Sequence, residues 1–175
     1  MPIDSTKEFK PINISVLTVS DTRTEATDKS GQILVKKIKE KGHGLTHKQI
    51  VKDEKEEIKK ILLDWGKDKN VDVILATGGT GLTGRDTTPE ALDEIKDKDI
   101  PGFGELFRLI SYKKIGASTI QSRAMAVLVK GTYVFALPGS SGAVTDAWED
   151  ILKFQLDSRF RPCNFIELIP RLNEQ

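Results

Sequence analysis

The fold is decided by VDVILATGGTG, residues 71–81, in which the clearest strand of the chain runs into a glycine-rich turn. Strand patterns and helical patterns alternate on both sides of this segment. One strand pattern, ISVLTVS (14–20), is a short β-branched run of the kind that is covered on both faces. Strands separated by helices imply right-handed βαβ crossovers. The sequence therefore predicts a three-layer, doubly wound α/β domain with a mostly parallel sheet and helices on both faces.

The remaining elements follow from apolar periodicity and from helix start and stop signals. Upstream of residue 71, the predicted elements are helices at 31–42 and 56–66 and a weaker strand at 46–51. Downstream, they are helices at 89–95, 104–116 and 118–131, a strand at 132–138 and a long amphipathic helix at 141–160. On this prediction residues 96–131 contain no strand, and Trp65 and Trp148 lie on apolar helix faces in the core.

The size and composition of the chain are those of one globular domain. Its 175 residues are 38% apolar and 30% charged, and a formal net charge of +1 argues against a dedicated nucleic-acid surface. No stretch approaches the ~20 apolar residues of a membrane helix, and the start MPIDSTKEFK lacks the apolar core of a signal peptide. Cys163 is the single cysteine, so no internal disulfide is possible. We expect a cytoplasmic protein with no membrane or nucleic-acid partner, a flexible tail over residues 1–11 and a single domain over residues 12–170.

Three predicted strands end in unusual polar segments, TVSDT (18–22), ATGGTG (76–81) and LPGSSGA (137–143). In open α/β sheets, ligands bind outside the carboxyl ends of the strands, so we expect these segments to form one site. Gly78, Gly79 and Gly81 let the backbone turn sharply and present N–H groups to an anion, although an ordinary tight turn would use glycines too. We interpret the loop as a cradle for an anionic, phosphorylated small molecule.

Two standard nucleotide motifs nearly match this loop. Residues 79–84 fit G-x-G-x-x-G, but the dinucleotide fingerprint needs an immediate helix and an acidic residue after the next strand. Here the predicted helix begins only at Pro89, and no strand is predicted in residues 96–131. The segment also approaches G-x-x-x-x-G-K-[ST], but Arg85 and Asp86 replace the lysine and the hydroxyl residue. Neither a nicotinamide-dependent oxidoreductase nor a normal P-loop is favoured.

Asp86 is the strongest candidate metal ligand. Thr88 is placed to cap the helix that starts at Pro89, so Asp86 is not required as the cap. A carboxylate beside a phosphate loop is repulsive unless a cation lies between them, and Mg²⁺ takes one or two carboxylates together with phosphate oxygens and water. The alternative is a solvated aspartate paired with Arg85. Asp53, by its spacing alone, is better explained as part of a capping box, DEKE (53–56), for the next helix.

Several other polar groups have two interpretations. Asp21 follows the first strand, where it would bind a metal or a hydroxyl group or simply form a turn. PGSSG (138–142) opens the last helix, where free N–H groups and the helix dipole make a second anion site that is compatible with capping by Ser140. Turn geometry explains the glycines of the connection PGFGE (101–105), but nothing local explains Glu105. The two histidines, His43 and His47, have no cysteine nearby, which argues against a metal site there.

The ordered set of TVSDT, TGGTG with Arg85-Asp86 and Thr88-Pro89-Glu90-Ala91, PGFGE and LPGSSGA resembles the molybdopterin-binding family. The resemblance covers residues 14–158. It implies a doubly wound domain that binds the tricyclic pterin molybdopterin. Catalytic members are adenylyltransferases, which use Mg²⁺ and ATP to make adenylylated molybdopterin and pyrophosphate. Family members form trimers or hexamers, and the metal-insertion protein of the pathway is an implied partner.

The resemblance also implies roles for individual residues. Asp86 would be the essential carboxylate that holds Mg²⁺ at the reacting phosphates, with Asp53 as its partner. The nucleotide phosphates would lie on Gly78, Gly79, Thr80 and Gly81, with Ser20, Asp21 and Arg85 nearby. The pterin would face Pro138, Gly139, Ser140 and Ser141, and Glu105 would line the same pocket. Because inactive relatives tend to depart from Arg85-Asp86 and this chain keeps both, we expect an active enzyme in preference to a non-catalytic molybdopterin-binding scaffold oligomer.

Overall fold

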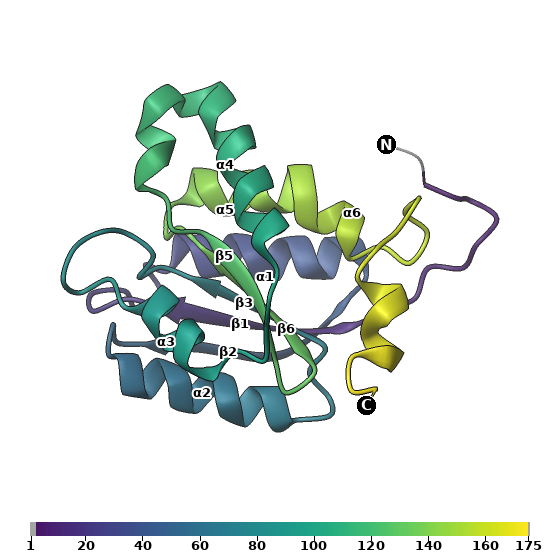
Figure 1. Cartoon of the computed structure of the whole chain (residues 1–175), viewed down its shortest axis with the longest axis horizontal. Helices are drawn as coiled ribbons and strands as arrows, with labels where there is room; N and C mark the ends of the chain where they lie inside the picture. The colour runs from purple at the N-terminus through teal and green to yellow at the C-terminus, as the bar shows by residue number, and fades with distance from the viewer. Residues whose placement is uncertain (1–2, 175) are drawn as a thin grey trace.

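The computed structural model describes residues 3–174, and within them the chain folds around a six-stranded sheet (Figure 1). The strand order is β2-β1-β3-β6-β5-β4. The parallel part consists of β2 (Gly44–Val51), β1 (Asn13–Val19), β3 (Val73–Thr77) and β6 (Thr132–Leu137). Beyond it, β5 (Met125–Val129) is antiparallel to β6, and the short strand β4 (Lys98–Asp99) is antiparallel to β5. The prediction of a mostly parallel sheet is confirmed.

Helices cover both faces of the sheet, as Figure 1 shows. One face carries α1 (Lys29–Lys41), α4 (Pro101–Ile115) and α5 (Ser141–Ala147), and the other carries α2 (Lys55–Lys67) and α3 (Thr88–Ile95). The alternation of side chains along β3 explains both layers, because successive residues of a strand point to opposite faces. Val73 and Leu75 pack with the first group of helices, and Ile74 and Ala76 pack with the second. The predicted three-layer, doubly wound architecture is therefore confirmed.

The predicted helix over residues 118–131 is wrong. Its first part is a 3-10 helix, η1 (Gly116–Gln121), and its second part is the strand β5. β5 and β6 form a hairpin whose turn residues, Lys130 and Gly131, have φ values of 53° and 82°. Two central residues with positive φ match the twist of a two-residue hairpin. The short apolar run of β5 cannot be distinguished from a buried helix by periodicity alone, so the expectation of no strand in residues 96–131 was wrong as well.

Two further helix boundaries differ from the sequence prediction. The segment 101–105 is not a connection but the first turn of α4, with Pro101 at the position where a missing N–H costs nothing. The long helix predicted from residue 141 is present but shorter. After α5 it continues through a π-helical turn, η2 (Trp148–Leu152), into α6 (Lys153–Gln155). Trp65 and Trp148 are buried in the core, as predicted.

The N-terminal segment lies beside the C-terminal segment. The Asp4 N–H donates to Arg159 O at 2.9 Å, and the Lys10 N–H donates to Ser158 Oγ at 2.9 Å. Residues 1 and 2 of the expected tail lie outside the described residues. After α6 comes a second 3-10 helix, η3 (Ile166–Arg171). None of the helices between residues 3 and 174 is long and apolar enough to cross a membrane.

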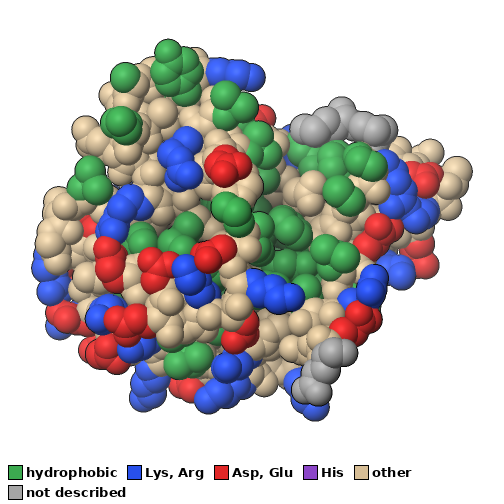
Figure 2. Space-filling model, viewed as in Figure 1, with side chains coloured by type: hydrophobic (Ala, Val, Ile, Leu, Met, Phe, Trp, Pro, Cys, Tyr) green, Lys and Arg blue, Asp and Glu red, His purple; other side chains and the backbone are tan. Residues whose placement is uncertain are grey.

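On the face in Figure 2, Lys and Arg side chains alternate with Asp and Glu side chains instead of gathering by sign. Many of these charges are paired across the surface, for example Lys55 and Lys59 of α2 with Glu94 of α3. Hydrophobic side chains gather in a hollow of this face. The charge distribution agrees with the small net charge of the chain.

Candidate functional site

The carboxyl ends of the parallel strands are level with one another. Thr77 at the end of β3 is the Cα partner of Thr18 in β1 and of Leu137 in β6. The segments that follow these strands therefore emerge at one edge of the sheet. Gly139 is so close to Gly78 that a Cβ on Gly139 would be 3.3 Å from the Gly78 Cα. Of the three segments that the sequence predicted to form one site, the glycine loop and the Pro138 turn meet directly here.

These segments form two walls of a cavity of about 420 Å³. One wall is the glycine loop with Asp86, and the second is the turn from β6 into α5. The third wall comes from α4 and the 3-10 helix η1. The lining residues are Gly78, Gly79, Thr80, Gly81, Asp86, Phe107, Ser111, Ile115, Ser118, Thr119, Gln121, Ser122, Pro138, Gly139, Ser140 and Ala143. The cavity joins apolar surface to many backbone and hydroxyl groups, as expected of a site for a small polar molecule.

The glycine loop passes very close to neighbouring backbone. Gly78 has a φ of 103°, and a Cβ there would be 2.1 Å from Val19 O at the end of β1. No side chain fits in this space. The loop is also fastened to α3, because Thr88 Oγ1 donates to Gly78 O at 3.0 Å. The predicted role of Thr88 as a helix cap is wrong, since Thr87 is the N-cap residue and Thr88 lies in the first turn of α3.

Asp53 and Asp86 both lie at this loop. A Cβ on Gly79 would be 2.9 Å from both carboxylate oxygens of Asp53, and a Cβ on Gly81 would be 2.8 Å from Asp86 Oδ2. Asp53 does not cap α2, because Glu54 is the N-cap residue there and α2 receives no side-chain cap. Instead, Asp53 Oδ1 accepts hydrogen bonds of 3.1 Å from the N–H and the Oγ1 of Thr87. The capping-box interpretation of Asp53 was therefore wrong.

The two carboxylates are in different electrostatic situations. Burial raises the pKa of Asp53, the hydrogen bonds from Thr87 oppose this, and the charges of Asp86 and Asp21 raise it further. Burial acts on Asp86 too, but hydrogen bonds from the Thr83 side chain and N–H hold its pKa below the ordinary value. The charged form is therefore favoured at Asp86 and disfavoured at Asp53, and a cation beside Asp53 would relieve the repulsion.

Arg85 does not pair with Asp86. Its Nε and Nη2 donate to the two carboxylate oxygens of Asp21 at 3.0 and 2.9 Å, and its Nη1 donates to Glu54 at 2.9 Å. The hydrogen bond from Arg85 holds the pKa of Asp21 below its ordinary value. Asp21 Oδ1 also accepts from the Asp53 N–H at 3.2 Å. The Arg85–Asp21 pair therefore braces the backbone behind Asp53, outside the cavity wall.

The remaining predicted site residues divide into two groups. Ser140 caps α5 by accepting from the Ala143 N–H at 3.2 Å, and it lines the cavity together with Pro138 and Gly139. Ser141, Ser20 and Glu105 are not among the lining residues. The Ser20 Oγ accepts from the N–H groups of Thr22 and Arg23 in a turn after β1.

The third wall of the cavity was not predicted from the sequence. Phe107 and Ser111 come from α4, about one and two turns beyond Gly104, and Thr119 and Gln121 come from η1. The mostly polar run STIQS (118–122) was a usable signal, because polar side chains are unusual on a buried helix. It was hidden by the wrong assignment of residues 118–131 to one helix.

A metal site made from protein side chains alone is absent from residues 3–174, where no group of three or more His, Cys, Asp or Glu side chains could hold an ion. His43 is buried and its Nδ1 accepts from the Ile12 N–H at 3.3 Å, and His47 pairs with Asp68 at 3.0 Å. Asp53 and Asp86 could still supply two of the ligands for Mg²⁺, which usually keeps several waters and binds substrate phosphates.

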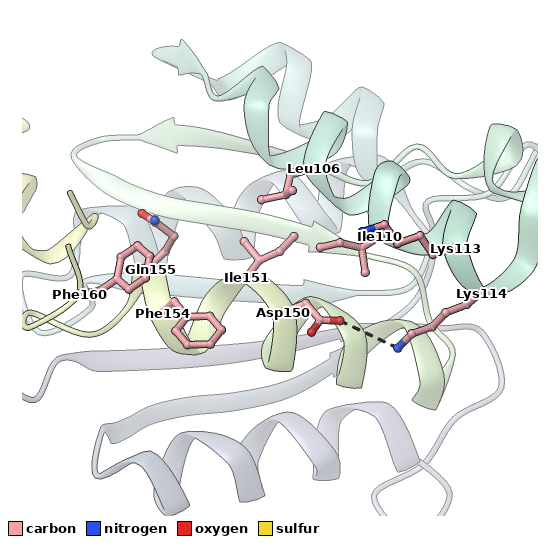
Figure 3. Close-up of a pocket in the computed structure, with 9 residues that line it drawn as sticks. All are labelled: Leu106, Ile110, Lys113, Lys114, Asp150, Ile151, Phe154, Gln155 and Phe160. Atoms are coloured by element: carbon pink, nitrogen blue, oxygen red, sulfur yellow. Dashed lines mark ion pairs between the residues drawn. The ribbon is translucent and has the colours of Figure 1, made fainter. Parts of the chain in front are cut away.

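A second hollow of about 410 Å³ lies on a different side of α4 (Figure 3). Leu106, Ile110, Ile151 and Phe154 make it mainly apolar, and Lys114 and Asp150 approach within 4.0 Å at its rim. It contains few polar groups that could orient a ligand. The cavity at the glycine loop is therefore the better candidate site.

Fold and cavity together define a class of protein, the α/β proteins with a small-molecule site at the carboxyl edge of the sheet. The chain belongs to the molybdopterin-binding family, described as "Probable molybdopterin binding domain", which it matches over residues 15–158. This membership gives it a role in molybdenum cofactor biosynthesis and agrees with the resemblance found in the sequence.

Relatives with known sequences and structures agree with this family. The chain is 48% identical over 158 residues to the molybdenum cofactor biosynthesis protein B of Escherichia coli (strain K12), covering 90% of this chain and 93% of that protein. A crystal structure of a molybdenum cofactor biosynthesis protein B matches with a TM-score of 0.86 and 43% identity, covering 97% of this chain and 100% of that chain. The tungsten cofactor synthesizing protein MoaB from Pyrococcus furiosus matches with a TM-score of 0.73 and 36% identity, covering 82% and 91%.

Proposed function

We propose that this protein transfers the adenylyl group of Mg-ATP to molybdopterin and releases pyrophosphate. One observation carries the proposal: Asp53 and Asp86 lie at Gly79 and Gly81 of the same glycine loop. A loop that only binds an anion would gain nothing from two carboxylates beside it. With a divalent cation between the carboxylates and the phosphates, the same arrangement becomes favourable.

The residues at the loop fit Mg²⁺. Burial is the main cause that raises the pKa of Asp53, and the charges of Asp86 and Asp21 raise it further, so the carboxylates repel one another without a cation. Asp53 and Asp86 would hold the ion, and phosphate oxygens and water would complete its shell. When bound, Mg²⁺ would neutralise charge on the reacting phosphates.

The protein's own groups would position the two substrates. The N–H groups of residues 78–81 would hold the nucleotide phosphates, and the start of α5 with Ser140 would face the pterin. A phosphate oxygen of molybdopterin would attack the α-phosphorus of ATP. The bond from that phosphorus to the oxygen bridging to the β-phosphorus would break, and pyrophosphate would leave with the bonding electrons. Catalysis of this kind depends on positioning and charge neutralisation and needs no nucleophilic side chain.

Replacement of Asp86 tests the proposal. Asp86→Asn keeps an oxygen that can accept from Thr83 but removes the charge, so we expect pyrophosphate release to fall by at least ~100-fold while molybdopterin binding stays near the wild-type level. Asp93→Asn is the matched control, because Asp93 lies exposed on α3 and pairs with Lys96. The measurement is molybdopterin-dependent pyrophosphate release with ATP and Mg²⁺, together with pterin binding by fluorescence.

Two results would count against the proposal. If Asp86→Asn turns over like the wild type, the metal role of Asp86 is wrong. If the wild-type protein binds molybdopterin but releases no pyrophosphate, the protein is a non-catalytic molybdopterin-binding protein or scaffold. The trimer or hexamer and the metal-insertion partner that the family resemblance implies belong to this proposal and are compatible with either result.

A further inference from the structure

Arg123 makes a dense set of contacts to the glycine loop. It lies between η1 and β5, in a stretch of chain that carried no prediction for the site. Its Nε donates to Gly81 O at 2.8 Å, and its Nη2 donates to Asp86 O at 2.9 Å. Its own N–H donates to Thr80 O at 3.3 Å. One residue thus binds three backbone carbonyl groups on both arms of the loop.

Within the segment from Leu82 to Thr87, Arg85 is tied to Asp21 and Glu54, and Thr87 is tied to Asp53. The Leu82 side chain is 68% exposed, and the Asp86 carboxylate accepts from Thr83, which belongs to the same loop. The base of the loop is fastened by the Thr88 N–H, which donates to Gly79 O at 3.0 Å. Between that base and the loop tip, the guanidinium of Arg123 bridges the carbonyls of Gly81 and Asp86. Because Arg123 contacts the backbone carbonyl of Asp86 itself as well as that of Gly81, this bridge restricts where Asp86 can lie.

The geometry is one that arginine satisfies and lysine does not. A guanidinium presents five donors in a rigid plane, so it can bind two carbonyl oxygens and a carboxylate in fixed directions. Besides the two carbonyl groups, the guanidinium of Arg123 binds the carboxylate of Glu90 in α3 through Nη1. The Arg123 side chain is only 28% exposed, and it does not line the cavity. It therefore acts on the loop and not directly on a ligand in the cavity.

We propose that Arg123 is a positioning residue that clamps Gly81 and Asp86 in one geometry, so that the Asp86 carboxylate is held beside the glycine N–H groups before substrate binds. The effect on catalysis rests on the proposed adenylyl transfer. The effect on the loop does not, because the hydrogen bonds are made by the protein alone. The two parts can therefore fail separately.

The first experiment measures the loop without any ligand. Amide hydrogen exchange is compared in the wild type, Arg123→Met, Arg123→Lys and Glu90→Gln, with Arg171→Met as the control because Arg171 pairs with Glu174 near the C-terminus. We expect exchange in residues 80–87 to rise about tenfold or more in Arg123→Met and to rise in Arg123→Lys, with Glu90→Gln and Arg171→Met close to the wild type. Exchange in β1, β3 and β6 stays unchanged when the global fold is intact.

The second experiment measures turnover in the same variants. A misplaced Asp86 lowers kcat by about 100-fold in Arg123→Met, with KM for ATP within about a factor of three, since the glycine N–H groups remain. In Arg123→Lys, which keeps the charge and much of the packing, kcat should fall as well. This fall would show that a positive charge alone does not position Asp86.

Unchanged exchange in residues 80–87 of both Arg123 variants would overturn the clamp. The clamp is also overturned if Glu90→Gln reproduces the Arg123→Met exchange, because the ion pair and not the carbonyl contacts would then fix the loop. If Arg123→Met does not fold, Arg123→Lys carries both measurements. An inactive wild type would remove the adenylyl transfer proposal, while the exchange experiment would still decide whether Arg123 holds the loop.

Discussion

The carboxylate of Asp53 lies directly against Gly79. A Cβ on this glycine would be 2.9 Å from both Asp53 oxygens and 2.4 Å from Thr88 Oγ1. Gly79 also has a φ of 63°, which side chains other than glycine adopt with strain. The loop therefore runs between a carboxylate and a hydroxyl group that leave space for a hydrogen atom and nothing larger. This contact explains why a glycine, and not simply a flexible residue, stands next to the candidate metal ligand.

The first prediction follows from this contact. Gly79→Ala should lower the free energy of unfolding by about 2–4 kcal/mol, because the left-handed backbone costs ~1–2 kcal/mol and the new methyl group must displace Asp53 or Thr88. Urea unfolding at neutral pH measures the change. Gly84→Ala is the control in the same loop, where a Cβ would meet nothing within 4 Å, so a change of at most ~0.5 kcal/mol is expected. Equal losses in the two variants would show that loop flexibility, and not the contact, sets the cost.

The convergence of the glycine loop and the turn at Pro138 could be predicted from the sequence. It needs only two parallel strands and the rule that their carboxyl ends share an edge. The role of Asp53 could not be predicted in this way. Its hydrogen-bond partner Thr87 is 34 positions away, whereas the local spacing of Asp53 and Glu56 favoured a capping box. The local spacing is compatible with helix capping by Asp53, but the contact with Thr87 places the carboxylate at the glycine loop instead.

The second prediction concerns the charge of Asp53. Because its pKa is raised in the folded protein, mainly by burial, its ionisation is less favourable there than in the unfolded chain. The free energy of unfolding should therefore fall as the pH rises through the folded-state pKa. Asp53→Asn keeps an acceptor for Thr87 and removes the charge, so it should be more stable than the wild type at pH 7. Solvent screening limits this gain to about 1 kcal/mol, a rise in Tm of about 2–4 °C.

Thermal unfolding in metal-free buffer at pH 7 and pH 3.5 measures this effect. At the lower pH the wild-type carboxyl carries less charge, so the difference in Tm between the two proteins should shrink. Asp64→Asn on the exposed side of α2 is the control, and it should leave Tm unchanged at both pH values. A lower Tm for Asp53→Asn at pH 7 would mean that the carboxylate stabilises the metal-free fold, and the argument for a cation between Asp53 and Asp86 would lose its support.

The third wall of the cavity could not be predicted from the sequence. Ser118 to Ser122 and Arg123 lie in a stretch that alternates between 3-10 helix, extended chain and strand within ten residues. Such short elements are stabilised by what they contact, and their own periodicity is too brief to identify them. The Lys130-Gly131 turn was the available signal for the hairpin. Arg123 could not be found from sequence, since its importance comes from three carbonyl groups 37 to 43 positions upstream in the chain.

The third prediction concerns His43, which is buried between the N-terminal segment and the start of β2. Its ring lies 5.1 Å from the ring of Phe9, and its Nδ1 accepts from the Ile12 N–H, so a proton on Nδ1 would break that hydrogen bond. Burial, with the nearby charge of Lys41, lowers the pKa of His43 to about 4, although Asp157 opposes this. In the unfolded chain His43 titrates near its ordinary pKa of 6.5. Stability from this group is therefore complete above pH 6.5 and is lost as the pH falls toward 4.

His43→Asn tests this directly, because the Asn oxygen can accept from the Ile12 N–H and carries no proton at any of these pH values. The wild type should lose about 2 kcal/mol of unfolding free energy between pH 6.5 and pH 4 relative to this variant, allowing for partial solvent access to the ring. Urea unfolding across that range measures the difference, in which the titration of the carboxylates common to both proteins cancels. His47→Asn is the control and should keep the wild-type slope, since His43 is still present. Parallel slopes in the wild type and His43→Asn would mean that His43 accepts a proton in the folded protein as readily as in the unfolded chain, and that the segment around Ile12 opens at no cost.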